Sequence, residues 1–295
     1  MRYGIVPVEF RPAAERVVVD GVPDFSKFDI LDIVKQAVNI EHISVIELTL
    51  DIEYIIPEAL TPSRVDELAE LKEELGHSYT AHLPLWSIEP ASFNEYVRSG
   101  SVESVVHSIE LVEPLEPEYY VLHSTGPLAA EFSNLDFPRE MVMLICGLMA
   151  GFSARSVEEI IAKTEIDPKR LAIENIEFPF EITRELVDEY DTSICFDTGH
   201  LLTRYSGDES VSEFYHRHKD RIVELHLHDG SYHEHDGVAV HRDHIALGQG
   251  EMPVREFLLE LVKDGFQGPL IFELTTPEVM ESLAYIAEVV PEALG

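Results

Sequence analysis

Basic residues are scarce in this sequence. Lys and Arg account for 21 of its 295 residues, against 56 Asp and Glu, and the formal net charge is −35. A protein this acidic repels polyanions, which argues against tight binding to duplex nucleic acid, although high salt would screen that repulsion over short distances. We interpret the acidity as a solvated acidic surface, of the kind found in proteins from hosts with a salty cytoplasm.

Cysteines and long apolar runs are also few. The two cysteines, Cys146 and Cys195, lie in apolar segments, which predicts buried free thiols. No apolar run looks long enough to span a bilayer. The N-terminus enters a strand-like stretch directly, without the apolar region of a signal peptide. We therefore expect a cytoplasmic protein with no membrane partner.

The sequence does contain a repeated alternation of strand-like and helix-like segments. Eight such repeats predict a parallel sheet closed into a single (β/α)8 TIM barrel. A doubly wound open sheet is the alternative, but no Gly-rich phosphate loop follows the first strand. No change of composition marks a linker, so we expect one domain over residues 1–295. The expected strands are 3–8, 44–50, 78–84, 119–124, 170–175, 193–198, 222–228 and 269–274.

The intervening segments have helical spacing. The helix over 62–75 should end at Gly76, and Ser156 with Glu159 resembles a capping box that begins a helix. The segment before Asp29 is expected to be a loop or hairpin, and the long loops 126–137 and 229–252 are expected to shape the substrate site. The expected helices are 28–38, 62–75, 101–112, 137–149, 156–163, 179–189, 210–218, 253–263 and 277–290.

Metal-type ligands stand at the ends of the predicted strands. The stretch 193–202 reads as a strand that ends in Asp197, turns at Gly199 and presents His200. Buried charges are costly unless paired or bound to a cation, and mixed His and carboxylate ligands suit Zn²⁺ or Mn²⁺ better than Mg²⁺ or Ca²⁺. The other strand-end candidates are His82, His123, Glu174, His226, His228 and Glu273.

Each of these residues has an ordinary structural explanation when taken singly. A lone strand-end histidine is more often a hydrogen-bonded core residue, and a lone buried glutamate is often salt-bridged, but together the set favours metal. Glu47 is a weaker candidate with a structural alternative. Histidines on helices or helix ends are expected to be solvated, and those of the last long loop to lie near the site or on the surface. These two sets are His42, His77, His107, His216 and His218, and His233, His235 and His241.

Three motifs extend this set into a family resemblance. They are Asp197-Thr-Gly-His200, His226-Leu-His-Asp229 and Asp243-His244-Ile-Ala-Leu-Gly-Gln-Gly250. With His82, His123, Glu174 and Glu273 they resemble the xylose isomerase-like barrel superfamily, and more closely its endonuclease IV (AP endonuclease) branch. The resemblance runs from the third strand to the eighth.

The resemblance to endonuclease IV implies a cluster of two or three zinc ions. By that resemblance His82, His123 and Glu174 hold the first ion, and Glu174 bridges to a second held by Asp197, His226 and Glu273. His200 and His244 would hold a third. The family has an aspartate two residues before the last of these histidines, where this sequence has Arg242. Asp243 or His228 would have to substitute.

The expected activity is that of a metal-dependent phosphoester hydrolase. Paired metals would clamp a phosphate and activate water, with Glu174, Glu273 and Asp197 as catalytic residues. The substrate would be a small phosphorylated molecule, for example the nucleotide loop of a cobamide, rather than duplex DNA.

Two alternatives remain from the sequence. The first is a sugar or polyol isomerase or epimerase, for which the resemblance implies the subset Glu174, Asp197, His226 and Glu273, with two carboxylates moving a proton. The second is a non-enzymatic barrel with a vestigial site.

Overall fold

A closed barrel of eight parallel strands forms the centre of the molecule. The computed structural model describes residues 1–295 apart from 8–16, 20, 57, 236–237 and 295. The first strand, β1, pairs with both β4 and β12, which closes the sheet as the sequence predicted. The barrel strands are β1 (Arg2–Ile5), β4 (Ile43–Thr49), β5 (Ser78–His82), β6 (Tyr120–Leu122), β7 (Leu171–Glu174), β8 (Ser193–Asp197), β9 (Ile222–His226) and β12 (Pro269–Phe272).

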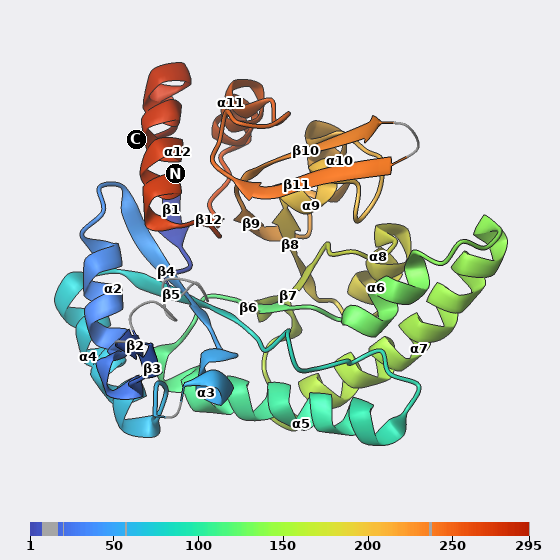
Figure 1. Ribbon diagram of the computed structural model, residues 1–295, viewed down its shortest axis with the longest axis horizontal. Coiled ribbons are helices and arrows are strands. Elements are labelled where there is room, and N and C mark those ends of the chain that lie inside the picture. Colours follow the sequence, from blue (N-terminus) through green and yellow to red (C-terminus); the bar gives the residue numbers. More distant parts are fainter. Residues whose placement is uncertain (8–16, 20, 57, 236–237, 295) are drawn as a thin grey trace.

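Helices surround the barrel (Figure 1). The predicted end of α4 is confirmed, because Gly76 takes a left-handed conformation with φ 71° and its N–H donates to the carbonyl of Lys72, as a C-terminal glycine does. The α-helices are α2 (Ile30–Val38), α3 (Ile52–Ile55), α4 (Pro62–Leu75), α5 (Glu95–Val112), α6 (Pro127–Ser133), α7 (Arg139–Thr164), α8 (Phe180–Glu189), α9 (Thr198–Leu202), α10 (Val211–His218), α11 (Val254–Asp264) and α12 (Thr276–Val289). The 3₁₀ helices are η1 (Phe25–Lys27), η2 (Glu113–Leu115), η3 (Pro168–Arg170) and η4 (Pro291–Ala293).

The predicted helix start at Ser156 is wrong. Ser156 lies in the middle of α7, one continuous helix of 26 residues. Its hydroxyl donates to the carbonyl of Pro90 at 2.7 Å and accepts from Arg98 Nη1 at 3.2 Å. The Ser156 hydroxyl therefore makes tertiary hydrogen bonds, and it does not cap a helix as the sequence pattern predicted. The short helix α6 lies in a segment expected to be a loop.

The helix α7 is more apolar than expected, since no apolar run of the sequence looked long enough to span a bilayer. Among the described residues it is the one helix long and apolar enough to cross a bilayer, by length and composition alone. Here it packs against α5, α6 and α8. Cys146 and Met149 are buried, whereas Met141, Leu144 and Leu148 are exposed.

The core has two parts. Strand residues that point outward pack under the helices, and those that point inward fill the barrel. Close packing inside requires glycine at position 4, since a Cβ there would lie 2.4 Å from Cδ1 of Ile271. Both cysteines are buried and free, as predicted. The expectation that His77 and His218 are solvated is wrong, because both are buried.

Two hairpins complete the described chain. The segment before α2 holds β2 (Val18–Val19) and β3 (Val22–Pro23), in agreement with the predicted loop or hairpin; Val8, the expected end of the first strand, lies outside the described residues. The long loop after β9 forms an antiparallel hairpin of β10 (Asp229–His235) and β11 (Val238–Ile245). Figure 1 shows this orange hairpin beside α9, which both of its strands contact.

Candidate metal centre

The predicted site residues meet at the carboxyl-terminal rim of the barrel. His82, Glu174, Asp197 and His226 are each the last residue of their strand. His123 and Glu273 follow β6 and β12 directly. Their neighbours Phe196, Leu225 and Phe272 are buried in the outer core. Because side chains alternate along a strand, the rim residues point into the barrel.

Glu174 is the centre of the first group of ligands. Its Oε2 lies 2.8 Å from Nε2 of His123 and 3.3 Å from Nε2 of His82. The carboxylate is buried. Burial alone would raise its pKa, but His123 and His226 hold the pKa of Glu174 well below its ordinary value. The Glu174 carboxylate is therefore ionised at neutral pH.

Three carboxylates converge on His226 in the second group. Nδ1 of His226 lies 3.2 Å from Oε1 of Glu174, 3.2 Å from Oε2 of Glu273 and 3.7 Å from Oδ2 of Asp197. Burial opposes ionisation of Glu273, but His226 and His244 hold its pKa well below the ordinary value. No Lys or Arg among the described residues pairs with these carboxylates, so a cation would remove a large electrostatic cost.

Asp243 lies among three imidazoles in the third group. Its carboxylate is 3.7 Å from Nε2 of His200, 3.6 Å from Nδ1 of His228 and 3.4 Å from Nδ1 of His244. Nδ1 of His228 is buried and has no hydrogen-bond partner in the described chain. Both residues that the sequence offered as substitutes for the missing aspartate are therefore at this group, while Arg242 is exposed.

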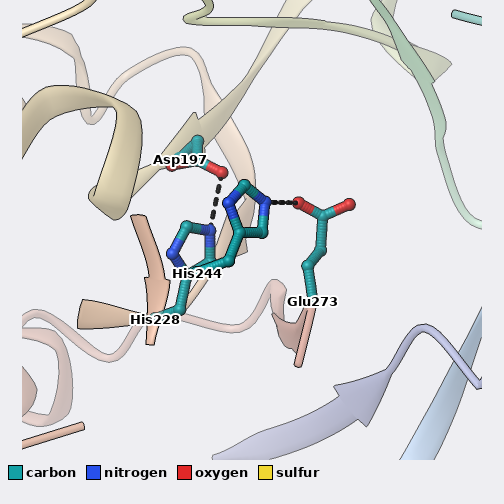
Figure 2. A group of neighbouring side chains, drawn as sticks. All are labelled: Asp197, His228, His244 and Glu273. Atoms are coloured by element: carbon teal, nitrogen blue, oxygen red, sulfur yellow. Dashed lines mark hydrogen bonds and ion pairs between the residues drawn. The ribbon is translucent and has the colours of Figure 1, made fainter. Parts of the chain in front are cut away.

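The second and third groups are joined through a stacked histidine pair (Figure 2). The ring centroids of His228 and His244 lie 4.2 Å apart, and the angle between the ring planes is 21°. Nε2 of His228 is 2.9 Å from Oδ2 of Asp197, and Nε2 of His244 is 3.3 Å from Oε2 of Glu273. Removing either histidine would therefore disturb both groups.

The Asp197-Thr-Gly-His200 motif builds a tight turn at the rim. Oδ1 of Asp197 accepts from the backbone N–H of His200 at 2.6 Å, which begins α9. Gly199 is required because a Cβ there would lie 2.2 Å from Cε1 of His228. The turn thus brings a carboxylate and two imidazoles together.

Asn175 is a supporting residue that the sequence did not single out. Its side-chain amide bonds both backbone groups of Asp197, accepting from N at 2.7 Å and donating to O at 2.9 Å. Nδ1 of His200 lies 3.0 Å from the carbonyl of Asn175. An imidazole that donates from Nδ1 leaves Nε2 free as a ligand, so Asn175 directs His200 toward Asp243. Its position directly after Glu174 was the available signal.

The hairpin is tied to the barrel by Asp229. Its buried carboxylate accepts four backbone N–H bonds, each 2.9 Å long, from Gly230, Gly248, Gly250 and Met252. The Gly-x-Gly pair of the third motif thus closes around a carboxylate. This anchor holds β11, and with it Asp243 and His244, over the rim.

A further acidic pair lies deeper in the barrel. Glu47 and Glu224 are buried and, with His226, form a deeper group whose candidate ligand atoms lie within 4.8 Å of one another. Burial, and next the charge of Glu47, raise the pKa of Glu224 well above its ordinary value. Of the hairpin histidines, His233 is exposed, and Nδ1 of His241 lies 3.0 Å from the carbonyl of Thr203.

A cavity of about 520 Å³ opens over the rim. Its polar lining consists mainly of the ligand residues, and its apolar side includes Trp86, which is 49% exposed. A pocket of this size holds a small organic molecule. The lining residues are Val6, Thr49, His82, Leu85, Trp86, His123, Glu174, His200, His244, Glu273, Leu274, Thr275 and Glu278.

The donor set fits a divalent cation. Four groups at the rim, including that of Asp197, His228, His244 and Glu273, each bring His and carboxylate atoms within 4.8 Å of one another. The rim carboxylates have imidazole partners but no Lys or Arg partner among the described residues, and Nδ1 of His228 has no hydrogen-bond partner there; both observations suit a bound cation.

Known proteins match this chain in sequence and in fold. The family model described as xylose isomerase-like TIM barrel matches residues 41–290. An uncharacterised protein of Methanocaldococcus jannaschii is 27% identical over 225 residues, which cover 72% of this chain and 70% of that protein. Similar solved structures include a D-tagatose 3-epimerase-like protein, with a TM-score of 0.70, 19% identity and coverage of 99% and 98% of the two chains. The D-psicose 3-epimerase of Clostridium cellulolyticum H10, solved with D-tagatose, gives a TM-score of 0.68 at 13% identity over 98% and 99%.

The expected phosphoester hydrolase is therefore wrong. The similar structures are sugar epimerases, which agree with the alternative of a sugar or polyol isomerase or epimerase. The hydrolase prediction depended on His82 and His123 as additional ligands. Both contact Glu174, a residue common to the two mechanisms, so their presence does not discriminate between them.

Proposed function

Because the chain belongs to the xylose isomerase-like TIM barrel family, we propose that it is a divalent-metal-dependent isomerase or epimerase of a small sugar or polyol. The observation that carries this proposal is the placement of Glu174 and Glu273. Each carboxylate lies 3.2 Å from Nδ1 of His226, and both line the rim cavity. Two bases beside one ligand imidazole suit transfer of a proton from and to carbon.

Glu174, Asp197, His226 and Glu273 would hold the principal cation. When bound, a divalent cation there polarises a substrate carbonyl and acidifies the adjacent C–H bond. One of the two glutamates takes the proton from carbon, and the other, after taking up a proton from solvent, delivers it to the opposite face. Their lowered pKa values keep both carboxylates ionised at neutral pH, the state in which a base can act.

The cavity favours an unphosphorylated substrate. Its described lining includes no Lys or Arg and several carboxylates, so a phosphate group would meet no cationic partner there. Trp86 offers a half-exposed aromatic side chain, and Leu85 and Leu274 also line the cavity. Such surfaces pack well against the C–H face of a sugar ring.

We also propose that the centre takes Zn²⁺ or Mn²⁺, with room for more than one ion. The mixed donors suit these metals. His82 and His123 with Glu174 form one further group, and His200, Asp243 and His244 form another. The second of these groups supports an additional site in which Asp243 serves in place of the family's aspartate.

The experiment is a metal-dependent exchange assay. Protein stripped with a chelator and reloaded with Mn²⁺, Co²⁺ or Zn²⁺ is incubated in D₂O with a panel of ketoses that includes D-tagatose, D-psicose and L-ribulose. We expect the ketose to gain deuterium at the carbon next to its carbonyl, and to form the epimer or isomer, only in the samples that contain metal-loaded protein.

Variants sharpen this test. Glu174→Gln and Glu273→Gln should abolish exchange while leaving the fold intact, because both side chains lie at the barrel mouth rather than in its packed layers. Glu185→Gln, an exposed carboxylate of α8, is the control and should react as the wild type does. Ordinary turnover by Glu174→Gln, or no exchange with any ketose, would overturn the proposal.

A further inference from the structure

The imidazole of His226 is held between two sets of carboxylates. On the rim side its Nδ1 faces Glu174 and Glu273. On the inner side its Nε2 lies 3.2 Å from Oε1 of Glu47, a buried residue of β4. One ring therefore connects the proposed metal ligands to the interior of the barrel.

Glu47 is itself fixed in place. Its Oε2 accepts a hydrogen bond of 3.0 Å from the hydroxyl of Thr80 on β5. Its Oε1 and Nε2 of His226 face each other without the alignment of a full hydrogen bond, and neither has another hydrogen-bond partner among the described residues. A small rotation of the imidazole would align these two atoms for a hydrogen bond.

We propose that Glu47 is a positioning residue that decides which nitrogen of His226 binds the cation; this inference rests on the proposed function. A neutral imidazole carries one N–H, and the partner of that N–H determines which nitrogen is left as the ligand. In the structure Nδ1 lies at a hydrogen-bond distance of 3.2 Å from Oε1 of Glu174. A cation that takes the lone pair of Nδ1 leaves the N–H on Nε2, where the Glu47 carboxylate accepts it. The lone pair of Nδ1 then points between Glu174 and Glu273.

Glu224 provides a matched control within the same layer. It is as deeply buried as Glu47 and belongs to the same group of residues. Both of its carboxylate oxygens lack a hydrogen-bond partner in the described chain, and no ion pair joins it to the described ring of His226. Glu224→Gln therefore leaves the contact between Glu47 and His226, and with it the tautomer of His226, unchanged.

The test measures metal affinity and metal-free stability together. Zn²⁺ alone is titrated into stripped wild type, Glu47→Gln and Glu224→Gln in competition with a chromogenic chelator. We expect Glu47→Gln to bind Zn²⁺ about 10- to 100-fold more weakly, and Glu224→Gln to bind it as the wild type does. The metal-free Glu47→Gln protein should melt no lower than the wild type, because it loses a buried carboxylate whose Oε1 has no hydrogen-bond partner.

Three results would overturn the inference. They are equal affinity in Glu47→Gln, an equal loss in Glu224→Gln, and a melting temperature that falls in parallel with affinity, since the last marks a merely structural role. If the wild type binds no Zn²⁺, the proposed function fails as well. If it binds Zn²⁺ and Glu47→Gln binds equally, only the role of Glu47 fails.

A spectroscopic measurement covers the case in which Glu47→Gln does not fold. Long-range ¹H–¹⁵N spectra of the zinc-loaded wild type report the tautomer of each histidine. Comparison with Glu47→Asp identifies the signal of His226. A protonated Nε2 on that ring supports the inference, and a protonated Nδ1 overturns it.

Discussion

The Asp229 carboxylate accepts a 2.9 Å hydrogen bond from the backbone N–H of Gly250, and a Cβ on Gly250 would lie 2.3 Å from Oδ1 of that carboxylate. Gly250→Ala should therefore destabilise the protein by about 1–3 kcal/mol, as measured by urea unfolding. Gly147→Ala is the control, for which we expect a change of the opposite sign. Gly147 lies inside α7 with nothing within 4 Å of its Cβ position, so alanine should stabilise by about 1 kcal/mol. Equal effects at the two glycines would contradict this account.

Buried histidines should make the protein sensitive to acid. Burial, and next Lys72, lowers the pKa of His77 to about 4, and burial, and next Arg184, lowers that of His218 to about 4. Both values lie below the ordinary 6.5, so the unfolded chain binds protons first. The contribution of each neutral, buried histidine to the free energy of unfolding is fully present above pH 6.5. It is lost as pH falls toward 4, by up to about 3 kcal/mol for each histidine.

Urea unfolding at about pH 7 and about pH 5 measures this loss. His77→Phe should reduce the difference between the two conditions, whereas His107→Gln should not, because His107 is exposed. An unchanged difference in His77→Phe would refute the assignment.

The third group of rim ligands predicts a change in metal content. Asp243→Asn should lower the Zn²⁺ retained after dialysis by about one ion per chain, because Asp243 contacts His200, His228 and His244. Arg242→Gln is the neighbouring control and should retain the wild-type content, since Arg242 is exposed. Elemental analysis of the dialysed proteins decides, and identical content in Asp243→Asn would remove this group from the metal centre.

The acidic composition predicts stabilisation by salt. With a net charge of −35, screening of self-repulsion should raise the melting temperature as KCl increases toward molar concentration. Calorimetry of the metal-loaded protein tests this, with sucrose as a neutral cosolute for comparison. A melting temperature that stays flat across the KCl series would contradict the interpretation of a repulsive acidic surface.

The barrel and its rim could be predicted because both depend on local alternation. A strand such as Ser193–Asp197 shows its inward residues by period two, and closure then brings distant strand ends such as Glu174 and Asp197 together. The start of a helix at Ser156 could not be judged in the same way. Its contacts with Pro90 and Arg98 come from distant segments, and they override a local capping pattern.

The sequence could not decide the activity, nor whether Asp243 or His228 would replace the family's aspartate, for different reasons. Asp243 reaches the rim only through the pairing of β10 with β11, and that register is not written in a local pattern. Glu174 and Glu273 suit either hydrolysis or proton transfer at carbon, so the residues alone could not choose between the two reactions.

The hairpin of β10 and β11 supplies Asp243 and His244 from outside the ring of barrel strands. If the proposed metal assignment holds, exchanging that one insertion would change the number of ion sites while sparing every candidate ligand contributed by the barrel strands. Nuclearity is thus separable from the scaffold, and relatives with different hairpins are natural places to look for a change in chemistry.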